Sequence, residues 1–419
     1  MLKFLGKNVS TLVLGTFIAQ FITIIFTPIL SRIFSPNHFG LFAIIFSLTG
    51  IFSTIIGGRY EIAIVQAKNN SESINLSFIS SLLMIIFTSI SVVICFLFKD
   101  FFVEISNLPF KLILLAPIVS LFIGLFNILN MLNTKFENYN TIALSKIIRS
   151  SLQGIFPIIL SLTFISSLNL IFGFISGFVG AYIVLFKKQF IQMFHKDYIS
   201  FKTITSLLKK YKEFPLYNAP SSLVDNFTLQ FPLIFIYFIA GETMNGYYFL
   251  AARMISIPTS LIGLSYAQVF YRDIVSIVDN NSKLLPFLIN TLKKLMIISI
   301  PIFILIFFAS PKIFPLVFGI EWKQSGIIAQ YLGCIFLIQF NVSTVSQILL
   351  LKENLYKGAV WKYIYFISSA FLYTTTYYFQ IEFYTFLTIL VIHEYILYAI
   401  YFYLIYSSAF ENDKRLIIK

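Results

Sequence analysis

Basic side chains follow one face of an apolar segment in this sequence. Lys146, Arg149 and Gln153 recur at steps of three and four residues within Thr141–Phe164, and Pro157 continues the series. On a helix these positions lie along one face. An Arg or Lys at the centre of a membrane helix costs about 2.5 to 3.5 kcal/mol in lipid, so we predict that this face lines a hydrated cavity able to hold an anion. Lys146 lies close enough to the helix end to snorkel to the membrane surface instead.

Two further segments carry charges where hydrocarbon is expected. Arg253 and Ser256 share a helical face within Gly246–Phe270, and Asp225 lies well inside Phe214–Ala240. We predict that Arg253 faces the same cavity as the basic stripe. Asp225 fits two roles equally, a proton-binding site or a structural partner of a basic residue.

The remaining candidates lie near segment ends and in the last segment. Arg59 follows the second apolar segment and could capture an anionic head group, while an ion pair with Glu61 or contact with lipid phosphate is an equal alternative. Glu394, next to His393, is near the middle of the last apolar segment, where a titratable carboxylate is a functional candidate. We therefore predict substrate binding by Arg59, Lys146, Arg149 and Arg253, and ion coupling by Asp225 or Glu394. Neither catalytic residues, a metal site nor a cofactor is predicted.

These side chains must be positioned by membrane-spanning helices. Twelve apolar runs are each near the ~20 residues that cross a bilayer core of ~30 Å. The runs are Val9–Leu30, Phe39–Gly57, Ile74–Phe98, Leu112–Leu132, Thr141–Phe164, Leu168–Phe186, Phe214–Ala240, Gly246–Phe270, Leu285–Ala309, Ile327–Leu351, Val360–Phe379 and Phe383–Tyr406. The fold class is therefore an all-α membrane protein with about 12 transmembrane helices.

The distribution of basic residues sets the predicted orientation. With the amino terminus inside, 22 of the 30 Lys and Arg residues fall on the inner side and five on the outer side. This bias fits an even number of spans with both termini in the cytoplasm. The net charge of +13 is scattered over helix ends, so we exclude nucleic-acid binding and expect contact with anionic membrane lipids.

A basic stretch after the sixth run divides the chain. We predict an N-terminal six-helix bundle at 1–186, a cytoplasmic basic linker at 187–213 and a C-terminal six-helix bundle at 214–419. Gly40 and Gly246 open corresponding helices of the two halves, a faint sign of duplication. The linker is predicted to be a tether between the halves, and the alternative is an amphipathic helix that dips Ile199, Phe201, Ile204, Leu207 and Leu208 into the inner leaflet.

Enzyme chemistry is not indicated by any motif. The chain contains no Gly-rich loop ending in Gly-Lys-Ser/Thr, and no predicted outer loop is large enough for a catalytic domain. We therefore predict a carrier and not an enzyme.

Two stretches resemble a known transporter family. They are Thr27–Val65, which contains the Pro-Ile-Leu-Ser-Arg turn and Arg59-Tyr60-Glu61, and Phe214–Asp273, which contains Gly246-Tyr247 and Ala252-Arg253. Both resemble the polysaccharide flippases (O-antigen and capsule group) of the multidrug/oligosaccharidyl-lipid/polysaccharide exporter superfamily. The likeness covers about a quarter of the chain strongly.

This resemblance implies a specific activity. Such proteins move an oligosaccharide on undecaprenyl diphosphate from the cytoplasmic to the outer leaflet of the bacterial inner (plasma) membrane, by alternating access through a V-shaped cavity between two bundles. Arg149, Arg253 and Lys146 would then bind the diphosphate, and Arg59 would capture it. Membrane lipids, a glycan polymerase and chain-length proteins are the partners that the resemblance suggests.

Two other functions are weighed against this one. A multidrug or cation antiporter of the same superfamily would need an acidic, aromatic cavity, whereas basic residues outnumber acidic ones in the spans of the first half. An integral-membrane glycan polymerase would need a large outer loop, and the widest predicted outer gap, about Ser310–Gly326, is small.

Overall fold

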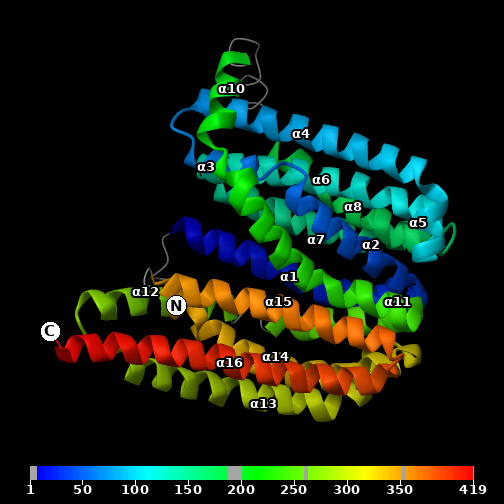
Figure 1. Cartoon of the computed structure of the whole chain (residues 1–419). Coiled ribbons are helices and arrows are strands. Elements are labelled where there is room, and N and C mark those ends of the chain that lie inside the picture. Colours follow the sequence, from blue (N-terminus) through cyan, green and yellow to red (C-terminus); the bar gives the residue numbers. More distant parts are fainter. Residues whose placement is uncertain (1–6, 187–200, 259–262, 352–353, 419) are drawn as a thin grey trace. The chain divides into compact units, whose positions relative to one another are not determined.

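The computed structural model describes residues 7–186, 201–258, 263–351 and 354–418. Every regular element within these ranges is helical, as Figure 1 shows, so the predicted all-α fold class is confirmed. The chain forms two compact units, Met1–Gly246 and Tyr247–Lys419. These units are defined by which residues contact one another and not by a repeat of helices. The predicted division into 1–186, 187–213 and 214–419 therefore stays a prediction. Residues 187–200 of the predicted linker lie outside the described ranges.

The first unit contains eight helices before the linker residues and three helical segments after them. They are α1 (Lys7–Ile33), α2 (Pro36–Ile55), α3 (Tyr60–Gln66), α4 (Asn70–Leu97), α5 (Lys99–Ser106), α6 (Phe110–Lys135), α7 (Tyr139–Ser161) and α8 (Ser167–Leu185), then α10 (Phe201–Lys210), a π-helical turn (Phe214–Asn218) and the start of α11 (Ala219–Pro258). Helix α11 contains a non-helical residue, Gly241, with φ of 78° and ψ of 177°. It is therefore two helices joined end to end at a sharp bend.

The second unit contains the end of α11 and the helices that follow it. They are α12 (Leu264–Asp279), α13 (Leu284–Phe318), α14 (Lys323–Val345), α15 (Leu355–Tyr378) and α16 (Phe383–Ile418), with 3₁₀ turns at Ile320–Trp322 and Ser346–Leu350. A buried carboxylate fixes the start of α13, because Asp413 of α16 accepts hydrogen bonds from the backbone N–H groups of Leu284 (2.6 Å) and Leu285 (3.1 Å). These donors have no partner within their own helix, so the contact caps it.

Ten helical segments of the described chain are long and apolar enough to cross a membrane. One of them, Phe214–Ile257, covers 44 residues and contains the seventh predicted run and the first half of the eighth. The eleventh run corresponds to α15, which is long enough at 24 residues but is not among the ten. Each predicted run except the eighth coincides mainly with one helix, whereas the eighth covers the end of α11 and the start of α12, with residues 259–262 outside the described ranges. The chain is a multi-pass membrane protein.

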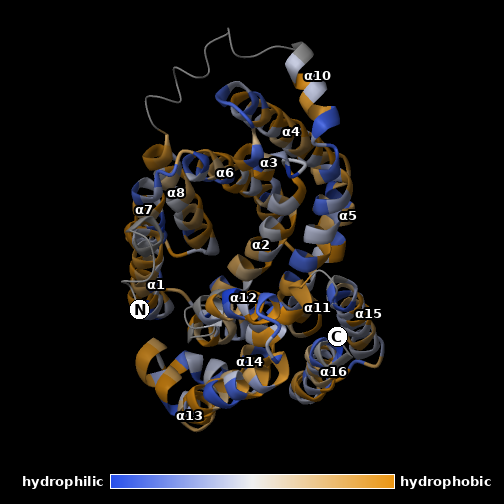
Figure 2. Cartoon of the chain, turned by 90° about the vertical axis from the view of Figure 1, so that its left-hand side faces the viewer, coloured by the Kyte–Doolittle hydropathy of each residue, from blue (hydrophilic) through white to orange (hydrophobic). Residues whose placement is uncertain are grey.

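The apolar side chains point outward as well as inward. Large hydrophobic residues such as Phe21 on α1, Leu97 on α4 and Phe308 on α13 are more than half exposed. The long helices are predominantly hydrophobic in the colours of Figure 2. This is the surface that lipid requires, because there the solvent around the helices is itself apolar.

Close packing of α1, α7 and α8 depends on small residues. A Cβ atom on Gly173 would overlap the ring of Pro157, and one on Gly177 would lie 2.8 Å from the backbone oxygen of Arg149. A Cβ atom on Gly154 would likewise overlap the ring of Phe26 on α1. Glycine at these positions lets α7 lie in contact with both neighbours, which fixes the helix that carries the basic stripe.

The alternative in which the linker helix dips into lipid is wrong for Ile204, Leu207 and Leu208, whereas Ile199 and the side chain of Phe201 lie outside the described part of the chain. Leu207 of α10 is 3% exposed and belongs to a core cluster with residues of α3, α4, α6 and α8, while Ile204 and Leu208 pack against that cluster. The hydrophobic face of α10 is thus buried by protein. A short amphipathic helix can lie on lipid or on its own bundle with the same sequence pattern, and here the bundle offers a matching apolar surface.

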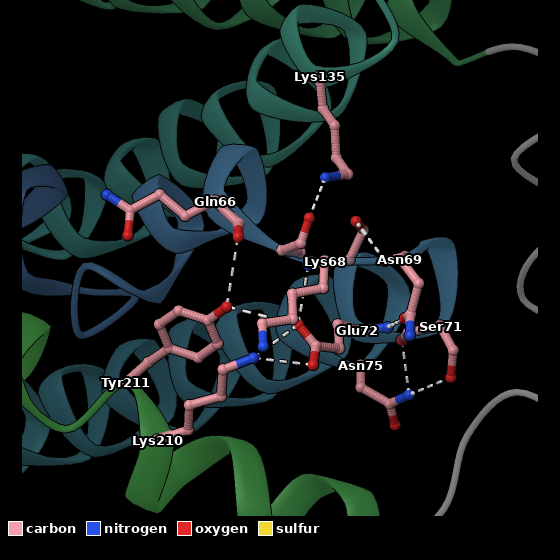
Figure 3. A network of polar contacts seen from close by, with 11 residues as sticks. Gln66, Lys68, Asn69, Ser71, Glu72, Asn75, Lys135, Lys210 and Tyr211 are labelled. Atoms are coloured by element: carbon pink, nitrogen blue, oxygen red, sulfur yellow. Dashed lines mark hydrogen bonds and ion pairs between the residues drawn. The ribbon is translucent and has the colours of Figure 1, made fainter.

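A polar network holds the other side of α10 (Figure 3). Lys210 Nζ lies 2.8 Å from Oε1 and 3.0 Å from Oε2 of Glu72, at the start of α4. The Tyr211 hydroxyl donates to the backbone oxygen of Gln66 at 3.5 Å and contacts Glu72 Oε2 at 3.4 Å. The hydrogen bond to Glu72 raises the pKa of Lys210. The described part of the linker is therefore docked on the first unit.

Candidate functional site

Arg149 is held between two aromatic rings within the first unit. Its guanidinium carbon lies 5.3 Å from the ring centroid of Phe126 on α6 and 5.2 Å from that of Phe178 on α8. The two rings meet edge to face with their centroids 5.4 Å apart. A cation over an aromatic face is stabilised by about 0.5 to 2 kcal/mol. The rings fix the guanidinium without occupying its hydrogen-bond donors.

The donors of Arg149 remain open to a ligand. The residue is half-buried on α7, and no carboxylate of the described residues lies within ion-pair distance of it. A guanidinium presents five N–H donors in a planar fork that matches a phosphate or carboxylate. An arginine inside an apolar helix bundle with its donors unpaired by acidic groups is suited to binding an anion.

Lys146 lies one turn earlier on the same helix and faces α1. Its Nζ donates to the Thr16 hydroxyl at 2.9 Å. The positive charge of Arg149 acts on Lys146. The two cations lie one turn apart on α7, with Lys146 toward α1 and Arg149 toward α6 and α8, so a shared cavity-lining face stays a prediction.

Arg253 has similar surroundings in the second unit. It is half-buried on α11, with its guanidinium carbon 5.9 Å from the ring centroid of Phe249, one turn before it. The backbone oxygen of Arg253 accepts a hydrogen bond of 2.9 Å from the Ser256 hydroxyl. No ion pair joins Arg253 to an acidic group in the described parts of the chain.

Arg59 lies in a sharp turn between α2 and α3. Gly58 and Arg59 both have left-handed backbone conformations, with φ of 59° and 63°. The guanidinium lies 4.0 Å from the Glu61 carboxylate, so the ion pair considered from the sequence is formed at the limit of ion-pair distance. Burial raises the pKa of Glu61, and the nearby Arg59 charge opposes that rise.

Glu394 on α16 is the most enclosed carboxylate among the predicted site residues. It is 4% exposed, and it accepts hydrogen bonds from the Tyr365 hydroxyl (2.7 Å) and the Gln339 side-chain amide (3.3 Å). The imidazole Nδ1 of His393 lies 4.0 Å away. The carboxylate of Glu394 also interacts electrostatically with Tyr248 and Tyr398. A buried carboxylate with neutral donors and no Lys or Arg partner is costly to ionise, so uptake of a proton or another small cation would stabilise it.

Asp225 and Glu394 belong to different units. Asp225 is half-buried on the first part of α11, within the first unit, whereas Glu394 belongs to the second unit. The two ion-coupling candidates thus lie in different units. The structure also brings in Tyr365, Gln339, Phe126 and Phe178, which sequence reasoning did not name, because nothing in the local pattern marks an aromatic or amide as the neighbour of a distant charge.

Comparison of the sequence with family models gives a match over residues 29–326, to the family described as polysaccharide biosynthesis protein. The chain belongs to this family. The match covers well over half of the chain, including α2 to α8 and all of α11. Comparison with curated proteins finds no match.

Solved structures of transporters share the fold of this polysaccharide biosynthesis protein. The lipid II flippase MurJ in an inward closed conformation aligns with a TM-score of 0.71 and 16% identity, covering 97% of this chain and 90% of MurJ. An inward-facing MATE-family multidrug transporter aligns with a TM-score of 0.70 and 13% identity, covering 97% and 96%. A transporter of the same superfamily from Pyrococcus furiosus aligns with a TM-score of 0.56 and 14% identity, covering 98% and 95%.

Family and fold together support a membrane flippase or transporter. They confirm the resemblance to the polysaccharide group of the exporter superfamily. The relatives with this fold are transporters and a flippase, not enzymes. Identities of 13 to 16% establish the fold alone, so the substrate must be argued from the side chains of this chain.

Proposed function

We propose that this protein is a flippase for lipid-linked oligosaccharides. It would move undecaprenyl-diphosphate-linked glycan units from the cytoplasmic to the outer leaflet of the bacterial plasma membrane by alternating access. The observation that carries the proposal is the pair of half-buried arginines, Arg149 and Arg253, which lie in apolar helices with no acidic partner among the described residues.

The charge of the cargo explains why such arginines are useful. A diphosphate is a compact anion, and an unpaired ion in a low-dielectric interior carries a penalty of several kcal/mol even after relaxation. Arg149 and Arg253, with Lys146 next to the former, offset this penalty by charge-assisted hydrogen bonds. Arg59 would meet the head group at the inner end of α2, where release from Glu61 would free its donors.

A drug or cation antiporter fits these side chains less well. Of the half-buried candidate residues, Arg59, Lys146, Arg149 and Arg253 are basic and Asp225 alone is acidic. The carboxylate of Glu394 is buried and accepts hydrogen bonds from Tyr365 and Gln339, which leaves no surface for a bulky organic cation. The Pyrococcus furiosus transporter with this fold is described as having a binding pocket of reverse polarity that suggests a different function. Pocket charge is therefore a sound basis for separating functions within this fold.

A glycan polymerase also fits poorly. The predicted outer gap after α13 shrinks in the structure, because α13 continues to Phe318 and α14 begins at Lys323. A 3₁₀ turn fills the space between them. No room remains there for a catalytic loop.

Coupling to an ion is a separate part of the proposal. Moving negative charge outward across an inside-negative membrane is favourable by about 2.3 kcal/mol per charge per 100 mV, so ion exchange is not obligatory. If an ion is exchanged, Glu394 or Asp225 would bind it. The burial of Glu394 without a Lys or Arg partner among the described residues favours a proton at that site.

The location of the lipid-linked glycan tests the function. Cells of the source bacterium that lack this protein should accumulate lipid-linked repeat units on the cytoplasmic face of the plasma membrane, with synthesis of the unit intact. Re-expression should move these units to the outer face, as measured by a membrane-impermeant lectin or glycosidase. Units already accessible from outside in the deletion strain would contradict the proposal.

A further inference from the structure

Arg59 lies in a backbone turn that needs support from its surroundings. Gly58 and Arg59 have left-handed backbone conformations, with φ of 59° and 63°, and α3 begins at the next residue, Tyr60. Glycine adopts this conformation freely, but a residue with a side chain keeps it only when the neighbouring structure holds it there. The direction of the Arg59 guanidinium therefore depends on the contacts that fix the start of α3.

The linker helix α10 supplies such contacts. Tyr60 is buried, and its hydroxyl donates to the backbone oxygen of Leu208 in α10 at 3.3 Å. At the other end of α3, the hydroxyl of Tyr211, which directly follows α10, donates to the backbone oxygen of Gln66 at 3.5 Å (Figure 3). Both ends of α3 are thus joined to the linker by tyrosine hydroxyl groups, and Arg59 is adjacent to one of these contacts.

The core cluster that includes α10 also contains the rings that flank Arg149. Leu207 of α10 belongs to one cluster of buried side chains with Tyr60, Phe126 and Phe178. The two phenyl rings are those whose centroids lie 5.3 and 5.2 Å from the guanidinium carbon of Arg149. A change at α10 can reach this arginine only through side-chain packing, whereas it reaches the turn before α3 directly through Tyr60.

We propose that α10 is a positioning element of the cargo site, and that Tyr60 sets the direction of the Arg59 guanidinium by holding α3 against α10. The inference rests on the proposed flippase function, in which Arg59 captures the diphosphate head group. With α10 docked, the turn is fixed and the head group meets a preorganised cation. With α10 released, the turn relaxes and capture weakens, while the membrane helices of the first unit keep their own contacts.

The first experiment measures the turn itself and needs no cargo. The backbone N–H groups of Tyr60 and Ile62 donate to the backbone oxygens of Gly57 and Arg59, so their hydrogen exchange reports on the turn. Exchange over residues 57–62 is followed in the purified full-length protein. Tyr60→Phe deletes the hydroxyl but keeps the buried ring, and it should raise this exchange by roughly three- to ten-fold, the usual effect of losing one neutral hydrogen bond.

A second variant and a control accompany Tyr60→Phe. Leu207→Ala loosens α10 without altering α3, and it should raise exchange over residues 57–62 as well. Tyr217→Phe is the matched control and should change nothing there, because it removes the hydroxyl of an exposed tyrosine in the π-helical turn. Unchanged exchange over residues 57–62 in both Tyr60→Phe and Leu207→Ala would overturn the proposal.

The second experiment tests whether the turn acts on the cargo. Binding of undecaprenyl diphosphate to the full-length protein in detergent micelles is titrated by native mass spectrometry. Tyr60→Phe should weaken binding by roughly three- to ten-fold, and Arg59→Ala should weaken it at least as much. In an Arg59→Ala background, Tyr60→Phe should have no further effect, because the tyrosine acts through the arginine. Additive losses would mean that Tyr60 supports the fold in general, which refutes a positioning role.

The two experiments separate this inference from the proposed function. Raised exchange at the turn, with binding unaffected by Arg59→Ala, would mean that α10 holds the turn while the assignment of Arg59 to the diphosphate falls. Unchanged exchange, with binding lost in Arg59→Ala, would mean the reverse, a diphosphate site that α10 does not position. Raised exchange with non-additive losses of binding is the result expected from both proposals together.

Discussion

Two charged residues of the apolar helices, Arg149 in the first unit and Glu394 in the second, have opposite surroundings. In the first unit Arg149 is a half-buried cation whose carbon faces two phenyl rings and whose donors have no acidic partner in the described chain. In the second unit Glu394 is a buried anion whose two oxygens accept hydrogen bonds from Tyr365 and Gln339. The first arrangement leaves room for a ligand, and the second leaves room for little more than a proton. In the proposed function, this difference would separate a residue that binds cargo from one that binds a small ion.

The largest expected effect on export is that of replacing Arg149. Arg149→Ala should reduce glycan export by roughly ten- to hundred-fold. The reason is that hydrogen bonding to a charged group contributes about 1.5 to 3 kcal/mol, and each 1.4 kcal/mol corresponds to about ten-fold. Arg149→Lys should restore part of it, because the charge remains while the planar fork is lost. Export is measured as surface glycan per amount of protein in the membrane.

The control for Arg149 is a lysine with a similar aromatic contact outside the bundle. Lys99 lies 5.5 Å from the ring centroid of Phe110 and is exposed. Lys99→Ala should leave export unchanged. Equal losses in both variants would mean that the aromatic contact serves folding and not transport.

The second prediction concerns the acidic residues Glu394 and Asp225. If a proton is exchanged, Glu394→Gln should abolish the dependence of export on pH, because glutamine keeps the hydrogen bonds to Tyr365 and Gln339 in part but cannot titrate. Asp225→Asn makes the same test for the first unit. Export is measured between pH 5.5 and pH 8 in reconstituted vesicles or energised cells. A pH dependence that survives in both variants would remove ion coupling at either residue.

A third test concerns the buried carboxyl group of Glu61, next to Arg59 in the first unit. Burial raises the pKa of Glu61. A carboxyl group with a raised native pKa stabilises the fold below its unfolded pKa, near 4.5, and this contribution is lost as the pH rises through the native pKa. Glu61→Gln should therefore gain Tm relative to the native protein between pH 5 and pH 8, by a few degrees. A relative loss of Tm over the same range would mean that the ion pair with Arg59 outweighs burial.

The smallest effects are expected at the docked helix α10. Leu207→Ala should raise amide hydrogen exchange across α10 strongly, because it removes a side chain from the core cluster. Lys210→Ala should raise it slightly, since the ion pair with Glu72 is near the surface. Lys209→Ala, an exposed residue of the same helix, is the control and should change nothing. If Lys210→Ala matched Leu207→Ala, the polar network and not the apolar face would hold the helix.

The sequence alone determined the helices and their apolar character. Every run except the eighth coincides mainly with one helix, because run length and hydropathy are local properties and the requirement for internal hydrogen bonding in lipid allows few alternatives. The positions of Arg149, Arg253 and Glu394 within those helices could be predicted for the same reason. The alternative that placed the apolar face of α10 in lipid was wrong for Ile204, Leu207 and Leu208, since an amphipathic pattern indicates which face is buried and not what covers it.

The tertiary structure decided which residues meet. Phe126 and Phe178 flank Arg149 from two other helices. The side chains of Asn37 and Glu242 are joined by a hydrogen bond although they are 205 positions apart in the sequence. Local periodicity carries no information about such pairs, because they arise when separate helices pack. The chain therefore determines by itself that charges enter the membrane, while only the packing of its helices decides whether each charge is left open to a ligand, enclosed, or paired.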